Sequence, residues 1–261
     1  MSANQPIAET VHYQIDDARR TAWITLDRPP LNVIDIPMMR QLSRAVEADI
    51  SSCDFRIFAG AGTKAFSAGV EIADHTPERI GEMLTAFHDV FRRMARTNAV
   101  TIAVVHGHCL GGGMELATFC DFVIAAESAT FGQPEIKLAC FPPVALITFP
   151  QLAGLRAALD LILTGRSISA PEAAELGLVT RVVPDAKLKS AVEGLLGELT
   201  SLSPVALRLT RQKLRARLDA DFDARLQEVE KVYLDELMKS DDAREGIRAF
   251  LEKRAPVWKG R

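Results

Sequence analysis

The sequence predicts an α/β fold, and three observations support this class. The chain has 261 residues, enough to bury a substantial core as one domain or as one domain with a helical extension. Between residues 37 and 126, short apolar runs that suit buried strands alternate with helical patterns, which favours parallel strand pairing. Beyond residue 135 the pattern becomes almost entirely helical. We therefore expect a layered α/β core followed by a helical C-terminal region.

The first half of the chain begins with a loose tail over residues 1–10. Two short strands are predicted at 11–16 and 21–27, and a third at 55–59. Between them, residues 37–50 carry apolar side chains four positions apart and begin with a proline. This pattern predicts an amphipathic helix.

Two loops in this half could lie close to a ligand. The loop 28–32 begins with the cation of Arg28, which either binds phosphate or is exposed. Two prolines end the preceding strand there, because proline cannot donate to a strand ladder. The loop 60–72 is rich in small residues, which let a ligand approach the main chain. Taken alone, a plain surface turn is the better explanation of this second loop.

The remaining elements follow in the same way. Residues 77–97 have a helical pattern with a basic end, and 99–105 and 122–126 have the apolar content of buried strands. Further helices are predicted at 156–164, 170–176, 186–200, 204–217, 221–239 and 241–253, with a short extended piece at 179–183. Ser169 and Ser203 each precede a helix-start pattern.

Composition narrows the classes of function. The formal net charge of -3 gives no basic footprint for nucleic acid or a membrane surface, so we expect a small-molecule partner. No N-terminal signal pattern and no apolar run of about 18 residues is present, which predicts a cytoplasmic protein. The cysteines lack C-x-x-C spacing and lie in apolar surroundings, so we expect reduced, buried thiols: Cys53, Cys109, Cys120 and Cys140. The H-x-H pair at 106–108 is interpreted as turn residues, and no metal site is expected.

The stretch 106–121 is the strongest candidate for a functional site. Three glycines at 111–113 open a helix, and the free N–H groups of a first helical turn favour negative charge. This is the chemistry of an oxyanion hole. Glu115 follows in apolar surroundings, where a charge is costly. A tight turn with an ordinary helix-capping glutamate is the alternative, whereas the spacing of nucleotide-binding glycine motifs is not met.

Five motifs in order resemble the crotonase superfamily of enoyl-CoA hydratases and isomerases. They are FSAGVEI at 66–72, LGGGMELATFCD at 110–121, FGQPEI at 131–136, LTGRSISAPEAAELGLVTRVV at 163–183 and EGIRAFLEKRAPVWKG at 245–260. The resemblance implies a crotonase (ClpP-like) spiral of ββα units with a C-terminal helical trimerisation region, assembled as a homotrimer or a dimer of trimers. It places the core with the acyl-CoA site in residues 1–200 and the oligomerisation region in residues 201–261.

The resemblance also implies the catalytic groups. Backbone N–H groups of Val70 and Gly112 would form an oxyanion hole for the thioester oxygen of an acyl-CoA. Hydratases of this family use two glutamates twenty positions apart, here Glu115 and Glu135, whereas isomerases often keep only one. Carboxyls in unlike settings can hold unlike protonation states, so we expect Glu115 to activate water and Glu135 to protonate the α-carbon. The alternative is that the pair shares both tasks through the same water.

Coenzyme A is expected as part of the substrate, with no separate cofactor. By resemblance it is bound, mainly through backbone, by Arg28, Leu31, Val33, Ala68, Val70, Glu71 and Ile72. Phe250 and Lys253 would come from the C-terminal helix of a neighbouring subunit and close over the nucleotide. Solvated surface is the alternative for Arg28 and Lys253.

The sequence departs from ordinary enoyl-CoA hydratases after the second glutamate. A glycine-rich stretch that helps to seat the attacking water is replaced by ACFPPVAL at 139–146. Together with RPPLNVID at 28–35, this looks most like the cyclohexa-1,5-diene-1-carbonyl-CoA hydratases, which add water to a cyclic dienoyl thioester. Two alternatives stay open: a double-bond isomerase, and a non-catalytic trimer that binds an acyl-CoA or another partner.

Overall fold

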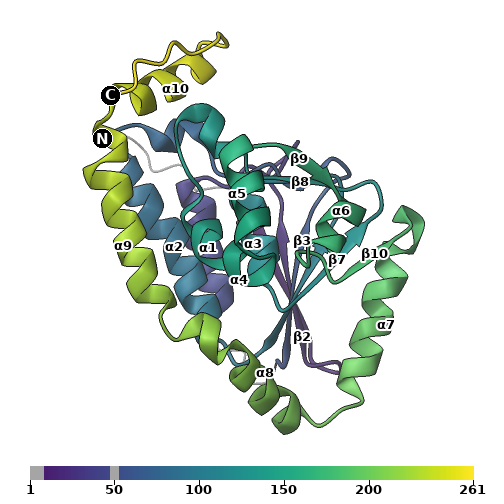
Figure 1. Ribbon diagram of the computed structural model, residues 1–261. Helices are drawn as coiled ribbons and strands as arrows, with labels where there is room; N and C mark the ends of the chain where they lie inside the picture. The colour runs from purple at the N-terminus through teal and green to yellow at the C-terminus, as the bar shows by residue number, and fades with distance from the viewer. Residues whose placement is uncertain (1–8, 48–52) are drawn as a thin grey trace, which may run out of the picture.

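The computed structural model describes residues 9–47 and 53–261, which form two β-sheets wrapped by helices (Figure 1). Within these residues the larger sheet has the spatial order β1 (Val11–Asp16), β2 (Thr21–Leu26), β3 (Phe55–Gly60), β5 (Val100–Val105), β7 (Phe122–Ala126) and β10 (Arg181–Val183). β1 is antiparallel to β2, and all other neighbours are parallel. The predicted parallel core is confirmed.

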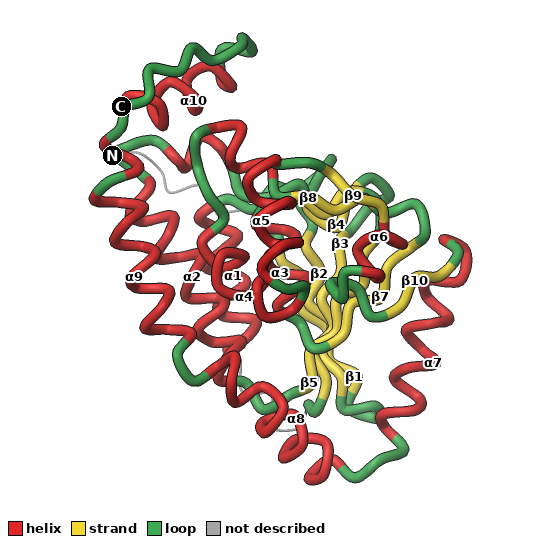
Figure 2. Tube along the Cα trace, in the orientation of Figure 1, coloured by secondary structure: helices red, strands yellow, loops and turns green. Residues whose placement is uncertain are grey.

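The smaller sheet takes its strands in alternation with the larger one. It contains β4 (Ala65–Ser67), β6 (His108–Leu110), β8 (Thr130–Gly132) and β9 (Ser167–Ser169) in that order. The chain runs from β3 to β4, from β5 to β6 and from β7 to β8, so each turn adds one strand to each sheet. Figure 2 shows β8 and β9 crossing one end of the long strands. This alternation is the spiral that the sequence resemblance implies.

Helices enclose both sheets. They are α1 (Ile36–Glu47), α2 (Ile80–Arg96), α3 (Gly112–Phe119), α4 (Pro143–Leu152), α5 (Leu155–Thr164), α6 (Ala170–Glu175), α7 (Leu188–Thr200), α8 (Pro204–Asp219), α9 (Phe222–Asp235) and α10 (Asp241–Leu251). Short 3₁₀ helices are η1 (Ile72–His75), η2 (Pro134–Leu138), η3 (Asp185–Lys187) and η4 (Leu237–Lys239). Figure 1 shows α9 beside α2, with α7 across the large sheet from them. Helices α8 to α10 form the helical C-terminal region that was expected.

The central parallel strands β3 and β5 are buried on both faces, as strands of parallel sheets usually are, whereas most residues of the edge strand β1 are exposed. Phe55, Ile57 and Ile102 pack against α7 on one face. Phe58 and Val105 belong to the larger cluster, which includes side chains of α2, α3 and α9. None of the described helices combines the length and apolar character that crossing a membrane requires.

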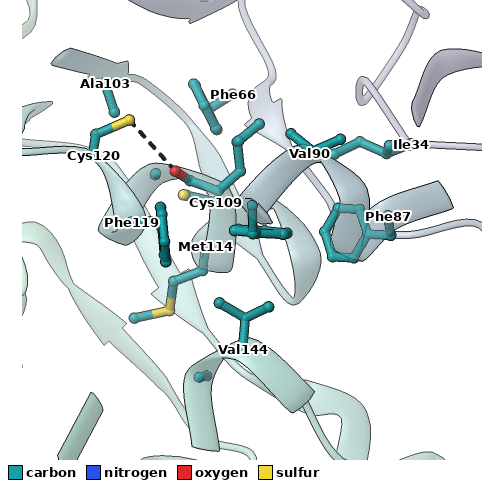
Figure 3. Close-up of a cluster of buried hydrophobic side chains, with 14 of the residues drawn as sticks. Ile34, Phe66, Phe87, Val90, Ala103, Cys109, Met114, Phe119, Cys120 and Val144 are labelled. Atoms are coloured by element: carbon teal, nitrogen blue, oxygen red, sulfur yellow. Dashed lines mark hydrogen bonds between the residues drawn. The ribbon is translucent and has the colours of Figure 1, made fainter. Parts of the chain in front are cut away.

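Helix α3 lies inside the larger cluster. Figure 3 shows its Met114 and Phe119 among Phe87 and Val90 of α2 and Val144 of α4. Every residue of α3 is buried, which fixes the backbone at the first turn of this helix. All four cysteines are buried and none forms a disulfide bond, as predicted: Cys53, Cys109, Cys120 and Cys140.

The sequence predictions fail mainly at short or proline-containing elements. The predicted loop 60–72 contains β4, and the interpretation of His108 as a turn residue is wrong, because His108 begins β6. Strands of three residues are too short for a period-two pattern to show. Helix α4 also escapes prediction because prolines at 142, 143 and 150 indicate a loop. A proline at the first helical position is nevertheless favourable, since its missing N–H has no partner there.

Candidate active site

One pocket brings together four residues that the sequence predicts as catalytic. Val70 and Gly112 lie on its wall with the carboxyl groups of Glu115 and Glu135. The remaining wall is largely apolar and includes Met83, Leu84, Phe87, Leu138, Phe141, Pro142, Pro143 and Tyr233. A concave, apolar site with a few convergent polar groups is the usual form of a small-molecule site.

The two predicted oxyanion-hole N–H groups lie outside the regular hydrogen-bond ladders. The bridge between Ile34 and Val70 uses the carbonyl of Gly69 and the N–H of Glu71, so it leaves the Val70 N–H unused. Gly112 is the first residue of α3, where an N–H has no carbonyl partner within the helix. Both donors are therefore available to an oxygen of a bound ligand.

Close packing explains the glycines of this motif. A Cβ atom at Gly112 would lie 2.7 Å from Val70 Cγ2 and 2.8 Å from Phe87 Cζ. A Cβ atom at Gly111, where φ is +51°, would lie 2.6 Å from Glu135 Oε1. The glycines thus let the start of α3 contact both the Val70 loop and the Glu135 carboxyl.

Glu115 is held by the N-terminus of another helix. Its Oε1 accepts hydrogen bonds from the backbone N–H groups of Val144 (2.8 Å) and Ala145 (2.9 Å), in the first turn of α4. Burial raises the pKa of Glu115 to about 7, although these two donors oppose the rise. Pro142 and Pro143 precede these donors, so the segment that we expect to depart from ordinary hydratases is also the one that holds this glutamate.

Glu135 lies in η2 in a different setting. The fully buried Gln133, with its amide nitrogen toward the carboxyl, donates to Oε2 at 3.0 Å and to Oε1 at 3.2 Å. Burial, together with the charge of Glu115, raises the pKa of Glu135 to about 8. Of the two carboxyls, Glu115 therefore ionises more readily and Glu135 keeps its proton to higher pH.

The predicted CoA-binding residues divide into two groups. Ala68, Val70 and Ile72 lie on the pocket wall. Arg28 contacts Glu71 instead, with Nη1 3.2 Å from Oε2, and its Nη1 also donates to the carbonyl of Val33 at 3.0 Å. The positive charge of Arg28 is thus partly neutralised by Glu71 of the same chain.

Two further predicted residues lie on the C-terminal helix. Phe250 belongs to α10 and Lys253 follows it, and both are exposed. Helix α10 packs on η1, η2 and η4 of its own chain. A Cβ at Gly246 would come within 2.2 Å of the Leu138 carbonyl oxygen, so α10 rests directly on η2, the helix of the second glutamate.

Sequence reasoning misses several groups that shape the site. Gln133 lies two residues before Glu135 in the FGQPEI motif, so the sequence could have predicted that it contacts this glutamate. The N–H donors of α4 could have been found from the proline pair, which is typical of a helix start. Tyr233 of α9 lies nearly a hundred residues from the other pocket groups in sequence, and no local pattern marks it.

Comparisons with known proteins agree with this fold and pocket. The family model described as enoyl-CoA hydratase/isomerase matches residues 18–261. A cyclohexa-1,5-dienecarbonyl-CoA hydratase of Thauera aromatica is 34% identical over 239 residues, which cover 91% of this chain and 92% of that protein. A probable enoyl-CoA hydratase of Mycobacterium bovis is 35% identical over 252 residues, covering 95% of this chain and 97% of the relative.

A solved structure supports the same assignment. The crystal structure of an enoyl-CoA hydratase from Mycobacterium avium subsp. paratuberculosis has a TM-score of 0.87 at 28% identity, covering 97% of this chain and 100% of the other. The chain belongs to the enoyl-CoA hydratase/isomerase family, the crotonase superfamily. The predicted spiral fold and an enzyme of the enoyl-CoA hydratase type are thereby confirmed.

Proposed function

We propose that this enzyme adds water across a conjugated double bond of an enoyl- or dienoyl-CoA thioester. One observation carries the proposal: a buried glutamate, Glu115, and a partly buried one, Glu135, share a pocket with two backbone N–H groups that the described residues leave unused. Hydration needs a base for water, an acid for carbon and donors for the thioester oxygen. An isomerase can shuttle a proton with a single carboxyl, so the pair favours hydration.

The roles of the two glutamates follow from their partners. Glu115 is the base that activates water, because the N-terminus of α4 favours its ionised form. Glu135 is the acid that protonates the α-carbon, because burial and its neighbour's charge keep its proton on. The N–H groups of Val70 and Gly112 bind the thioester oxygen as it gains enolate character. The loss of one such donor typically costs about 2.7 to 4 kcal/mol in the barrier.

For the acyl group, we propose a cyclic conjugated diene such as cyclohexa-1,5-diene-1-carbonyl. The wall beside Glu115 is formed by Phe141, Pro142 and Pro143, and the Phe141 ring packs edge-on against Tyr233 with centroids 4.8 Å apart. Rigid apolar groups of this kind suit a ring better than a flexible chain. The name of the Thauera aromatica relative supports the same substrate.

In this proposal the CoA moiety is part of the substrate, and the enzyme needs no separate cofactor. We assign CoA binding to two loops. The first contains Arg28, Leu31 and Val33, and the second contains Ala68, Val70, Glu71 and Ile72. Phe250 and Lys253 would come from a neighbouring subunit, in a homotrimer or a dimer of trimers built through residues 201–261. We also place the enzyme in the cytoplasm, and its four cysteines, none of which forms a disulfide bond, accord with a reducing compartment.

The test compares two substrates, crotonyl-CoA and cyclohexa-1,5-diene-1-carbonyl-CoA, by the loss of conjugated thioester absorbance. Strong preference for the cyclic diene supports the proposal and makes the 139–146 segment the specificity element. Preference for crotonyl-CoA leaves hydration intact and overturns the ring assignment. Activity on neither thioester overturns the proposed hydration of these substrates.

A further inference from the structure

A buried histidine lies on the wall of the same pocket and has no part in the proposed chemistry. His88 belongs to α2 and is fully buried. Its Nδ1 lies 2.6 Å from Oε1 of Glu230 on α9. Arg92 also donates to both carboxyl oxygens of Glu230, at 2.9 and 3.0 Å. The Glu230 carboxylate on α9 thus fixes the orientation of the His88 imidazole ring.

The charges around this ring decide which nitrogen carries the proton. Burial opposes ionisation of Glu230, yet the hydrogen bond from His88 and the charge of Arg92 hold its pKa below the ordinary value. Burial lowers the pKa of His88 despite the contact with Glu230, so the imidazole is neutral. A neutral ring that faces a carboxylate through Nδ1 carries its proton there, which leaves Nε2 as a bare acceptor.

The other nitrogen is the unusual feature. Nε2 of His88 is buried and has no hydrogen-bond partner among residues 9–47 and 53–261. A buried polar atom without a partner is destabilising, and in native proteins it calls for an explanation. The pocket residues nearest in sequence are Leu84 and Phe87, both apolar, so an apolar side chain would suit this position if packing were its only role.

We propose that Nε2 of His88 accepts a hydrogen bond from a hydroxyl group of the bound acyl moiety. The site then selects hydroxylated acyl-CoA thioesters, as substrates or as hydration products, over analogues without the hydroxyl. This inference rests on the proposed acyl-CoA function, and it adds the chemical class of the acyl group. Glu230 acts as a positioning residue, because it fixes the tautomer that leaves Nε2 free to accept.

Glu230 does not require the histidine. Arg92 already binds both of its carboxyl oxygens, and Arg92 Nε is held by Asp223 at 2.6 Å. Replacing His88 by phenylalanine therefore keeps a paired carboxylate and a ring of similar size. The change removes the acceptor while leaving Glu115 and Glu135 in place.

The experiment measures binding rather than turnover, with saturated thioesters that cannot be hydrated. The probes are cyclohexanecarbonyl-CoA and its analogues hydroxylated at ring carbon 2, 3 or 4, titrated calorimetrically into the wild type, His88→Phe and Thr85→Ala. Thr85 lies on the same helix as His88 but is exposed and outside the pocket, so its variant is the matched control. In the wild type, one hydroxylated thioester binds about tenfold more tightly than the parent, and Thr85→Ala keeps this ratio.

His88→Phe is expected to abolish that preference while it still binds the parent thioester. Equal binding of all four thioesters by the wild type, or an unchanged preference in His88→Phe, overturns the role of His88. Failure of every thioester to bind overturns the acyl-CoA function itself, which is a distinct result. If His88→Phe does not fold, Glu230→Gln is measured instead, and loss of the fixed tautomer lowers the preference. An unchanged preference in a folded Glu230→Gln then overturns the inference.

Discussion

The oxyanion hole can be perturbed without removing any catalytic side chain, through the substitution Gly112→Ala. The new Cβ atom would lie 2.7 Å from Val70 Cγ2, about 0.7 Å closer than the 3.4 Å at which ordinary contact begins. It would also lie 2.8 Å from Phe87 Cζ, so the strain cannot be relieved on one side alone. The side chains of Val70 and Phe87, or the segments that carry them, must therefore shift away from the first turn of α3. The Val70 loop and this turn carry the two N–H donors.

Displacements approaching 1 Å at a catalytic centre can cost about 100-fold in rate. We expect Gly112→Ala to lower kcat/KM by about 10- to 100-fold, which corresponds to about 1.4 to 2.7 kcal/mol in the barrier. Steady-state hydration kinetics measure this change. The loss should fall mainly on kcat, because the hole binds the transition state more tightly than the substrate.

Two other glycines provide matched controls. Gly81 in α2 and Gly197 in α7 have no atom within 4 Å of an added Cβ. Alanine at either position should leave kcat/KM unchanged and raise stability by up to about 1 kcal/mol, because alanine favours helix. Wild-type kcat/KM in a folded Gly112→Ala variant would refute the assignment of the oxyanion hole.

Three further predictions test the surroundings of the site. The rate should have a bell-shaped pH profile with its maximum between about 7 and 8, since Glu115 must lose its proton and Glu135 must keep it; a flat kcat/KM between pH 5 and 10 contradicts this. Gln133→Leu should lower kcat with little change in KM, because it removes the donor to both oxygens of Glu135; an unaltered kcat argues against that contact. Asn32→Ala should lower the free energy of unfolding by about 2 to 3 kcal/mol. The Asn32 side-chain amide donates to three backbone carbonyls at 2.9 to 3.3 Å, and the residue has a φ of +52° that alanine tolerates poorly. Denaturant unfolding measures this loss, and an unchanged midpoint contradicts it.

Much of the fold can be predicted from the sequence because its long elements carry strong periodic patterns. The strand at 99–105 and the helix at 77–97 agree closely with β5 and α2. The short strands of the smaller sheet cannot be found this way, since three residues fit any pattern. Only the pairing of β4, β6 and β8 across the spiral reveals them.

The candidate site is predictable to the extent that it lies in local motifs. Gly112 and Glu115 belong to one motif, and Val70 and Glu135 to two others, so the family pattern identifies all four. The contact between Glu115 and the start of α4 joins segments almost thirty residues apart, and no periodicity encodes it. Tyr233 reaches the pocket, and Glu230 reaches His88, only because α9 packs beside α2, which is a tertiary effect.

The central claim is that the glutamate pair adds water to an acyl-CoA thioester. Its most direct test is incubation of the enzyme with cyclohexa-1,5-diene-1-carbonyl-CoA and with crotonyl-CoA in ¹⁸O-labelled water, followed by mass spectrometry of the products. Glu115→Gln and Glu135→Gln are assayed in parallel, with acyl-CoA binding measured on each. The account predicts ¹⁸O in the product of the wild type, and sharply reduced turnover with nearly intact binding in both variants. A shifted double bond without label, or turnover unchanged in both variants, would contradict it.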